Sequence, residues 1–303
     1  MTRLRPVDIE VVPGNLVRYD ADLQQKAGLS LRQLACKAAD IPEDELGTMV
    51  DEVTIAAVPV SSGLGVIGGF SDAVGAIVTH LGFRAFVTEG HDVAGIAEAL
   101  ERGGDILMLA DDERFVAIIP GRPGVVDNTG ATARGFVAGL ESMRGGVTGA
   151  SALVLGCGPV GMAGAEALLE RGATVALLDA DRDRALEVFR ALSSTAPERI
   201  GVEEGGMNVL SRYDLIFEAT NSGGFIESHH LTSNTLMAAP GVPLALTADA
   251  LDRHGDRVLH DVLEIGTATM AVQAAAHRTG GEGLENAAGG PARVSGAWRL
   301  EGR

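Results

Sequence analysis

The sequence predicts an α/β protein of two domains, with the second domain built on a doubly wound parallel sheet. Three observations support this fold class. Short apolar runs of strand length alternate with stretches of helical spacing along most of the 303 residues. Residues 1–50 show helical spacing alone. A glycine-rich turn at residues 156–161 follows one apolar run and opens a helical stretch.

The first domain is expected over residues 1–146, as a helical segment followed by an α/β segment. Its apolar runs are rich in Val, Ile and Leu and are bounded by turn-forming residues, which is typical of strands. The stretches between these runs repeat apolar residues every three or four positions, which favours helices. The expected strands are residues 53–60, 85–88, 105–110, 115–119 and 125–127, and the expected helices are 71–81, 93–102 and 132–143.

The second domain is expected over residues 147–279, after a hinge at the glycine pair 145–146. Strands and helices alternate here, and helical crossovers between successive strands build a parallel sheet. A tail over residues 280–303 is rich in Gly, Ala, Glu and Arg and is expected to be mobile. The expected strands are residues 152–155, 174–178, 215–219, 236–239 and 258–262, and the expected helices are 161–171, 183–192 and 248–254.

The composition limits the classes of partner. The net charge is −17, and a surface that acidic repels nucleic acid and anionic lipid, so neither is expected as a partner. No apolar run is long enough to span a membrane, and the N-terminus lacks the apolar stretch of a signal peptide. The two cysteines, Cys36 and Cys157, lie far apart, which suits a reducing cytoplasm. The histidines His229, His230 and His260 lack ligand spacing, so no metal site is expected.

The turn at residues 156–161 has the glycine spacing of a dinucleotide site. Gly156 makes the tight turn, Gly158 lets the backbone approach a pyrophosphate, and Gly161 lets the helix pack close to the strand. Pro159 suits the first helical position, where no N–H donor is needed, and Val160 follows it. The N-terminus of the helix then offers N–H groups and a positive dipole end to phosphates. The turn therefore predicts a Rossmann domain.

Residues beyond this turn indicate which dinucleotide binds. Asp179 ends the next strand about 20 residues further on, where an acid binds the ribose hydroxyls of NAD and repels the extra phosphate of NADP. Because Arg182 lies close to Asp179 in the sequence, NADP is not fully excluded and remains the alternative cofactor. Thr220 and Asn221 follow a later strand, where a Rossmann loop runs past the nicotinamide ribose, and a plain strand-end cap is the alternative. Pro240 lies in a loop with a similar position after the next strand.

A second glycine-rich loop, at residues 61–69, leaves a strand and enters a helix in the first domain. It has no Gly-Lys-Ser/Thr sequence and is therefore not a P-loop. Ser61 and Ser62 supply hydroxyls, and the loop supplies backbone N–H groups, which together suit an anion. In the absence of a lysine, a carboxylate fits as well as a phosphate. An ordinary strand–helix turn is the alternative.

Two acids and an asparagine follow other strands of this domain. Asp111 and Asp112 end an apolar strand, where a carboxylate that faces an inter-domain cleft can hold an ammonium group or accept its proton. We expect Asp111 to be this group, and a solvated turn is the alternative for either acid. Asn128 adds an amide after a short strand, and a plain turn is again the alternative.

Seven short blocks spread along the chain form a specific combination with the Rossmann turn. They are residues 58–63, 65–68, 70–71, 106–112, 216–220, 240–243 and 265–270. Together these blocks resemble the PylD family of pyrrolysine-biosynthesis dehydrogenases, from about residue 6 to residue 272.

The resemblance implies an N-terminal helical and α/β substrate-binding domain joined to a Rossmann domain that binds NAD. It implies a small-molecule substrate, 3-methylornithyl-N6-lysine, whose terminal ornithyl amine is oxidised to an imine or aldehyde. Ammonia then leaves, and ring closure onto the ornithyl α-amine gives the pyrroline ring of pyrrolysine. By matching motifs, the substrate-contacting positions are Leu4, Ser61, Ser62, Asp111 and Asn128.

The chain departs from the family at three places. Glu264 stands where a small residue is expected, the segment around residues 43–52 is longer, and the tail after about residue 278 is extra. Two other functions stay open on the residues alone: an NAD-dependent dehydrogenase for another basic amino acid, and an NAD-binding sensor without catalysis. The sequence does not set the oligomeric state, and a homodimer is one open assembly.

Overall fold

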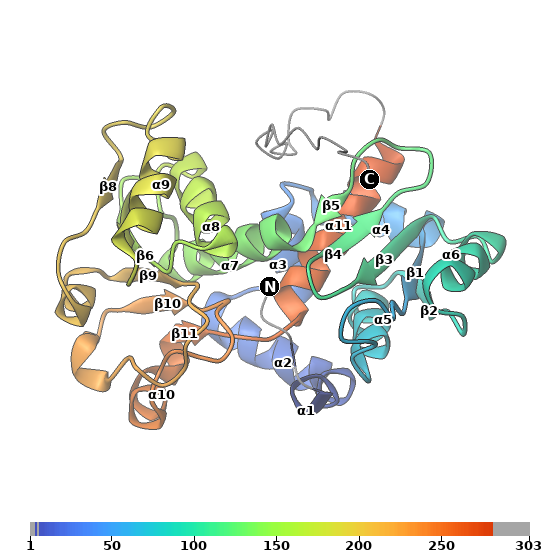
Figure 1. Cartoon of the computed structure of the whole chain (residues 1–303), viewed down its shortest axis with the longest axis horizontal. Coiled ribbons are helices and arrows are strands. Elements are labelled where there is room, and N and C mark those ends of the chain that lie inside the picture. The colour runs from blue at the N-terminus through green and yellow to red at the C-terminus, as the bar shows by residue number, and fades with distance from the viewer. Residues whose placement is uncertain (1–3, 5, 281–303) are drawn as a thin grey trace, which may run out of the picture.

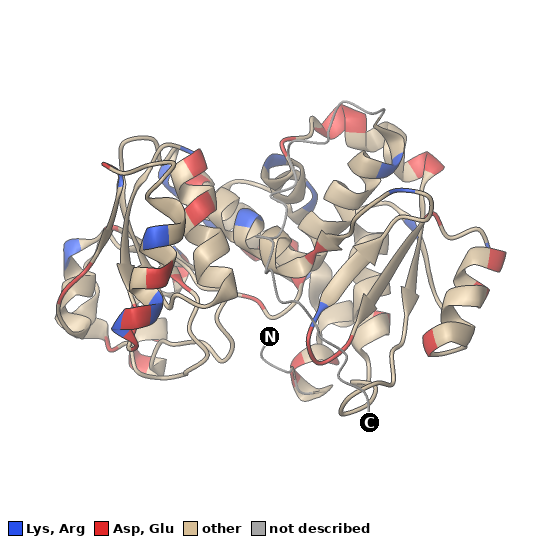
Figure 2. Ribbon diagram, turned by 45° about the horizontal axis from the view of Figure 1, so that its top comes forward, with Lys and Arg blue, Asp and Glu red and all other residues tan. Residues whose placement is uncertain are grey.

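The structure is a computed structural model that describes residue 4 and residues 6–280. The expected mobile tail from residue 281 onward lies outside the described residues. Two β-sheets lie side by side, and the helices α7 (Asn128–Arg144) and α11 (Glu264–Thr279) run between them (Figure 1). Acidic residues lie on the outer helices of both halves (Figure 2). Among the described residues, no helix has both the length and the apolar character needed to cross a bilayer.

The first sheet has the order β2-β1-β3-β4-β5. Strands β1, β2 and β3 run parallel, and β4 and β5 are antiparallel additions at one edge. Helix α6 (Asp92–Glu101) covers one face of this sheet, and α5 (Phe70–His80) covers the other with α11. The strands are β1 (Thr54–Val58), β2 (Arg84–Val87), β3 (Ile106–Ala110), β4 (Phe115–Ile118) and β5 (Val126–Asp127).

The second sheet is wholly parallel, with the order β11-β10-β9-β6-β7-β8. The expected α/β class with a doubly wound parallel sheet is thus confirmed, and the strand order reverses between β6 and β9. The strands are β6 (Ser151–Leu155), β7 (Thr174–Leu178), β8 (Ile200–Val202), β9 (Leu215–Glu218), β10 (Leu236–Ala238) and β11 (Val258–Leu259), and the helices are α8 (Pro159–Glu170), α9 (Arg182–Leu192) and α10 (Ala248–His254).

Four helices precede the first sheet, as the helical spacing of residues 1–50 predicts. The third begins at a capping box, in which the Ser30 hydroxyl and the Gln33 side chain each accept the other residue's backbone N–H. The segment at residues 43–52, which was expected to be longer than in the family, forms the fourth. The helices are α1 (Pro6–Ile9), α2 (Val12–Ala27), α3 (Leu31–Ala38) and α4 (Glu43–Glu52).

Helix α11 was not expected from the sequence. Residues 264–272 are all buried, because α11 packs against α3, α4, α5 and α7 as well as the first sheet. Its contact with α7 is close: an added Cβ on Gly135 would lie 2.4 Å from Ile265 Cγ2. The expected strand at residues 258–262 accordingly stops at Leu259, and the chain turns there into α11. The domain division at residue 146 stays a prediction, but the last helix of the second half lies against the first half.

Candidate active site

The glycine turn after β6 has the shape that its spacing predicts. Gly156 has φ +91°, a left-handed conformation that favours glycine, and its N–H donates to Leu178 O over 2.8 Å. A Cβ on Gly156 would lie 2.9 Å from the carbonyl of Ala219 on the neighbouring strand end. A Cβ on Gly161 would lie 1.8 Å from Gly156 O, so α8 packs directly against the turn. Both positions therefore exclude a side chain for reasons of packing.

Gly158 is different, because an added Cβ there would meet no atom within 4 Å. Pro159 follows as the first residue of α8, and Val160 and Gly161 complete the first turn, whose N–H groups have no acceptor within the helix. An open glycine backbone beside a helix N-terminus is a cradle that a phosphate fits. The residues of this turn therefore fit the pyrophosphate of a dinucleotide.

Asp179 follows β7 and lies beside the same turn. Its Oδ2 accepts the N–H of Cys157 over 2.6 Å, and its Oδ1 accepts the N–H of Asp181 over 2.8 Å. Each oxygen retains a second acceptor position, which a ribose hydroxyl can occupy. Arg182 pairs instead with Glu204 over 2.7 Å on the surface. Burial raises the pKa of the Cys157 thiol to about 12, so Cys157 is a thiol, not a nucleophilic thiolate, near neutral pH.

Glu218, which the sequence analysis did not single out, contacts both the loop after β9 and the loop after β10. Glu218 ends β9 and is fully buried, and its Oε1 accepts both the N–H (2.7 Å) and the hydroxyl (2.5 Å) of Thr220. Gly241 donates its N–H to Glu218 O over 3.2 Å. Asn221 is exposed, and Pro240 is half-buried in the neighbouring loop. The one feature of the sequence that could have drawn attention to Glu218 is that an acidic residue interrupts an apolar run there.

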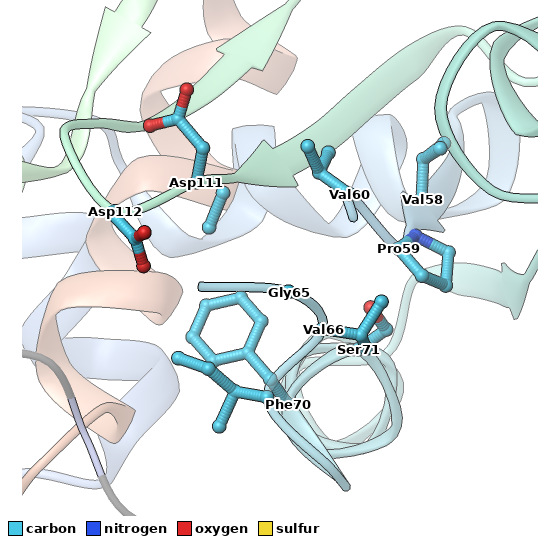
Figure 3. A pocket seen from close by; sticks show the side chains of 11 residues that line it. Val58, Pro59, Val60, Gly65, Val66, Phe70, Ser71, Asp111 and Asp112 are labelled. Atoms are coloured by element: carbon cyan, nitrogen blue, oxygen red, sulfur yellow. The ribbon is translucent and has the colours of Figure 1, made fainter. Parts of the chain in front are cut away.

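A small pocket lies at the carboxyl ends of β1 and β3 in the first half (Figure 3). Phe70 lines it and packs edge to face on Phe115, with ring centroids 5.2 Å apart. Residues of the glycine-rich loop close one side, and the two acids after β3 close the other. The lining is Val58, Pro59, Val60, Gly65, Val66, Ile67, Phe70, Ser71, Ala110, Asp111 and Asp112.

The two acids of this pocket point in different directions (Figure 3). Asp112 turns towards the glycine-rich loop, where its Oδ2 accepts the N–H of Leu64 over 2.6 Å. Asp111 is exposed and turns away from Phe70, and its Oδ1 accepts the N–H groups of Glu113 (2.8 Å) and Arg114 (2.7 Å). These two bonds hold the pKa of Asp111 below its usual value, so the carboxylate stays charged.

Ser61 is held by an acid that the sequence did not indicate. Its N–H donates to Asp92 Oδ1 over 2.8 Å, and its hydroxyl donates to Asp92 Oδ2. These bonds lower the pKa of Asp92, which has φ +53° although it is not glycine. Asp92 lies 31 positions from Ser61, so no local pattern links the two. Ser62 is exposed on the same loop, and neither serine lines the pocket.

Asn128 directly follows the short strand β5, as expected, and it is the first residue of α7 and not part of a plain turn. The preceding residue, Asp127, caps this helix by accepting the N–H of Thr129 over 2.8 Å. The Oδ1 atom of Asn128 is buried with no hydrogen-bond partner in the described part of the chain, and a Cβ on Gly266 would lie 2.9 Å from it. Leu4 is half-buried and packs against the main hydrophobic core. The structure therefore brings Asp111 to the pocket but places Asn128 at the α7–α11 contact.

A buried acid pair lies where α11 begins. Asp261 accepts the hydroxyl of Tyr19 over 2.7 Å, and Glu264 accepts the N–H of Leu263 over 3.1 Å. Burial raises the pKa of both acids, and repulsion by Asp261 raises the pKa of Glu264 further. The neighbouring His260 places Nδ1 2.8 Å from Ala239 O, and burial lowers its pKa. In the described residues, no group of three or more His, Cys, Asp or Glu could hold a metal ion.

Comparisons with known proteins identify the family. The family model for the N-terminal domain of pyrrolysine biosynthesis protein PylD matches residues 10–121. Pyrrolysine synthase from Methanosarcina barkeri (strain Fusaro) is 31% identical over 89% of this chain and 97% of its own length. Pyrrolysine synthase from Methanosarcina acetivorans is 30% identical, over 89% and 98% of the two chains.

A comparison with solved structures supports the fold. The quinate dehydrogenase from Corynebacterium glutamicum, determined in complex with NAD, superposes with a TM-score of 0.52 at 17% identity. The match covers 76% of this chain and 94% of that one, which shows that the two proteins share a fold. The sequence relatives carry the closer relationship, and by their identity and coverage the chain belongs to the PylD family of pyrrolysine-biosynthesis proteins.

Proposed function

We propose that this protein is an NAD-dependent oxidoreductase that makes the pyrroline ring of pyrrolysine from 3-methylornithyl-N6-lysine. The single observation that carries the proposal is the open Gly158 turn with Asp179 beside it, in a chain that aligns with pyrrolysine synthases over nearly its whole length. The reaction oxidises a CH–NH2 group, and its substrate is a small molecule with several ammonium groups and one free carboxylate.

The cofactor positions follow from the second sheet. Gly156, Gly158, Pro159, Val160 and Gly161 would hold the pyrophosphate at the start of α8. Asp179 would bind the adenosine ribose. Bound NAD supplies the acceptor for a hydride. Asn221, Thr220 and Pro240 would flank the nicotinamide end, with Thr220 contributing backbone and methyl groups because its hydroxyl already donates to Glu218.

The pocket in the first half would bind the substrate. In the structure, the Asp112 carboxylate accepts the Leu64 N–H, so this loop has the geometry to bind a carboxylate. Ser62 supplies a hydroxyl donor on the same loop, whereas the N–H and the hydroxyl of Ser61 both donate to Asp92, which fixes the orientation of Ser61. We propose that the substrate carboxylate binds beside these serines, with Leu4 and Asn128 completing the substrate contacts.

Asp111 would bind the reacting ammonium group. Both backbone bonds to its carboxylate go to Oδ1, so Oδ2 is available for a charge-assisted bond to a cation. Because the pKa of Asp111 is lowered, it is a stable anion and a weak base. Asp111 therefore orients the ammonium, and water takes the proton that leaves before oxidation.

The chemical steps balance on the substrate. The carbon that bears the terminal amine loses a hydride and the nitrogen loses a proton, which forms a C=N bond. The ornithyl α-amine then adds to this carbon, and ammonia leaves as the ring C=N bond forms. The chain's own contribution is to bind both ends of the substrate and to exclude alternative positions of the amine.

One assay separates this function from its rivals. Purified protein with NAD and 3-methylornithyl-N6-lysine should form NADH, followed at 340 nm, and mass spectrometry should detect pyrrolysine. Turnover of lysine or ornithine alone, without turnover of the dipeptide-like substrate, would instead support a dehydrogenase of another basic amino acid. NAD binding by calorimetry without turnover of any of these substrates would support a sensor.

A further inference from the structure

Glu218 is a fully buried carboxyl beneath the two loops that flank the proposed nicotinamide end. Its Oε1 atom is occupied by the N–H and the hydroxyl of Thr220. Its Oε2 atom has no hydrogen-bond partner within residues 6–280. A buried, unpartnered carboxylate oxygen costs free energy, so the group favours the neutral acid, which can donate Oε2–H.

The Oε2 atom of Glu218 faces the loop that contains Gly241. A Cβ on Gly241 would lie 2.6 Å from Glu218 Oε2 and 2.5 Å from Thr220 O. The two oxygens therefore face the same small volume, which only a glycine at position 241 leaves open. An ionised Oε2 would place an uncompensated negative charge at this close contact between the Gly241 and Thr220 loops, whereas the neutral acid carries no such charge.

Thr220 links this carboxyl to the pyrophosphate turn. The Cβ position on Gly156 lies 2.9 Å from Thr220 N, so the backbone that Glu218 holds is packed against the turn after β6. Gly241 is also tied to Glu218, through its N–H bond to Glu218 O. Glu218 thus contacts the loops after β9 and β10 through its side chain and its backbone carbonyl, and the first of these loops packs against the turn after the adjacent strand β6.

We propose that Glu218 is a positioning residue for the cofactor, and that its neutral form keeps the Thr220 loop packed against the Gly241 loop. This inference rests on the proposed binding of NAD. Burial raises the pKa of Glu218 to about 7, and the two bonds from Thr220 lower it by less. As pH rises through 7, Glu218 ionises, the buried negative charge disfavours the close packing of the two loops, and affinity for NAD falls.

The other titratable groups near these strand ends are Asp179, Cys157, His260 and the acid pair Asp261 and Glu264. Burial raises the pKa of Asp261 to about 6 and that of Glu264 to about 7, but this pair lies at the start of α11, where Asp261 accepts the hydroxyl of Tyr19 and not a group of the Thr220 or Gly241 loop. Asp179 and Cys157 lie at the opposite side of the pyrophosphate turn, and the pKa of Cys157 is about 12. His260 contacts Ala239 O at the end of β10, and burial lowers its pKa, which favours the neutral imidazole. No charged side chain shifts the pKa of Glu218. Glu218 is therefore the group whose proton should couple to cofactor binding near pH 7.

The test is calorimetric titration of NAD into the full-length protein at pH 6, 7 and 8. We expect the Kd of the unmodified protein to rise roughly tenfold over this range, and NAD binding near pH 7 to take up protons. Proton uptake is measured by comparing two buffers with different ionisation enthalpies. In Glu218→Gln, whose amide is uncharged at every pH, affinity should stay at the pH 6 level without proton uptake.

The control is Glu198→Gln, which removes an exposed acid before β8 and should leave the pH dependence unchanged. Glu218→Ala should bind NAD weakly at every pH. If this variant fails to fold, Glu218→Gln still decides the inference. The positioning role alone is overturned if the pH dependence of NAD affinity persists in Glu218→Gln. It is also overturned if the NAD affinity of the unmodified protein does not change with pH. No NAD binding at any pH overturns the proposed function as well.

Discussion

The carboxylate of Asp179 accepts a 2.6 Å hydrogen bond from the backbone N–H of Cys157, across the turn between β6 and α8. This bond ties the proposed ribose-binding acid to the proposed pyrophosphate cradle. The carboxylate therefore has a fixed position before a cofactor arrives. A fixed acid discriminates well between a ribose hydroxyl and a ribose phosphate, because it cannot move away from the second negative charge.

Asp179→Ala should weaken NAD binding and reduce the difference between the affinities for NAD and NADP. The change removes the acceptor for the ribose hydroxyls and also the repulsion of the 2′-phosphate. We expect roughly a tenfold or greater loss in NAD affinity, the scale for a lost hydrogen bond to a charged group. Titration of both cofactors measures this difference, with Asp181→Ala as a nearby control. Tight NADP binding by the unmodified protein would contradict the assignment.

Gly158→Val should abolish NAD binding and leave the fold intact. The Cβ position at Gly158 meets no atom within 4 Å, so the side chain fits the protein but fills the space of the pyrophosphate. Gly161→Ala is the matched contrast, because its Cβ would lie 1.8 Å from Gly156 O and must distort the turn. Circular dichroism and thermal melting report the fold, and calorimetry reports binding. A folded Gly158→Val protein with undiminished affinity would remove the turn from the cofactor site.

Asp111→Asn should lower kcat/KM for the substrate by roughly a hundredfold, the usual scale for groups that manage charge at a reacting atom. The change keeps the shape of the side chain and removes the charge that would hold the ammonium, so NAD affinity should be nearly unchanged. Asp112→Asn is the companion variant, since an amide oxygen can still accept the Leu64 N–H. Near-normal kinetics for Asp111→Asn with impaired kinetics for Asp112→Asn would transfer the role to Asp112.

Glu264→Gln should stabilise the protein near pH 7.5. The pKa values of Asp261 and Glu264 are raised in the folded state, so between about pH 4 and neutrality the folded chain holds more protons than the unfolded chain. Stability from this pair is therefore present at low pH and is lost as pH rises. The amide should recover roughly 1–3 kcal/mol of unfolding free energy at pH 7.5.

Urea unfolding at pH 5.5 and 7.5 measures this change for both proteins. The gain in Glu264→Gln should be small at pH 5.5, where the native pair already holds its protons. Tyr19→Phe is the opposing control, because it removes the donor to Asp261 and should destabilise the protein. An equal effect of Glu264→Gln at both pH values would show that the charge of this pair does not govern stability.

Local patterns predicted most of the two sheets and the pyrophosphate turn. Apolar runs between turn residues indicated the strands, and the three glycines of the turn were recognisable because they follow a fixed local spacing after a strand. Strand β8 was not predicted, because a strand of three residues is too short to show a recognisable apolar pattern. Helix α11 was not predicted either. Its first nine residues are buried on every side, so the sequence shows no polar face and no helical periodicity of apolar residues.

The first-half pocket was less predictable for a different reason. The sequence placed Asp111 and Asp112 at the end of β3 but could not say which would face the glycine-rich loop, since that depends on the turn that follows. Asp92 reaches Ser61 only through the pairing of distant loops. Glu218 resembles an interruption in a strand until the fold brings Gly241 over it.

Helix α11 also makes the first half discontinuous in sequence. The segment between the end of α7 and the start of α11 is an insertion, and α11 packs against β3, β4 and β5 only after it has been synthesised. During translation, the inserted sheet can complete its core while the earlier one still lacks its last helix. A fragment that ends at residue 146 should therefore expose the apolar faces of α5 and α7, which binding of a hydrophobic dye would report.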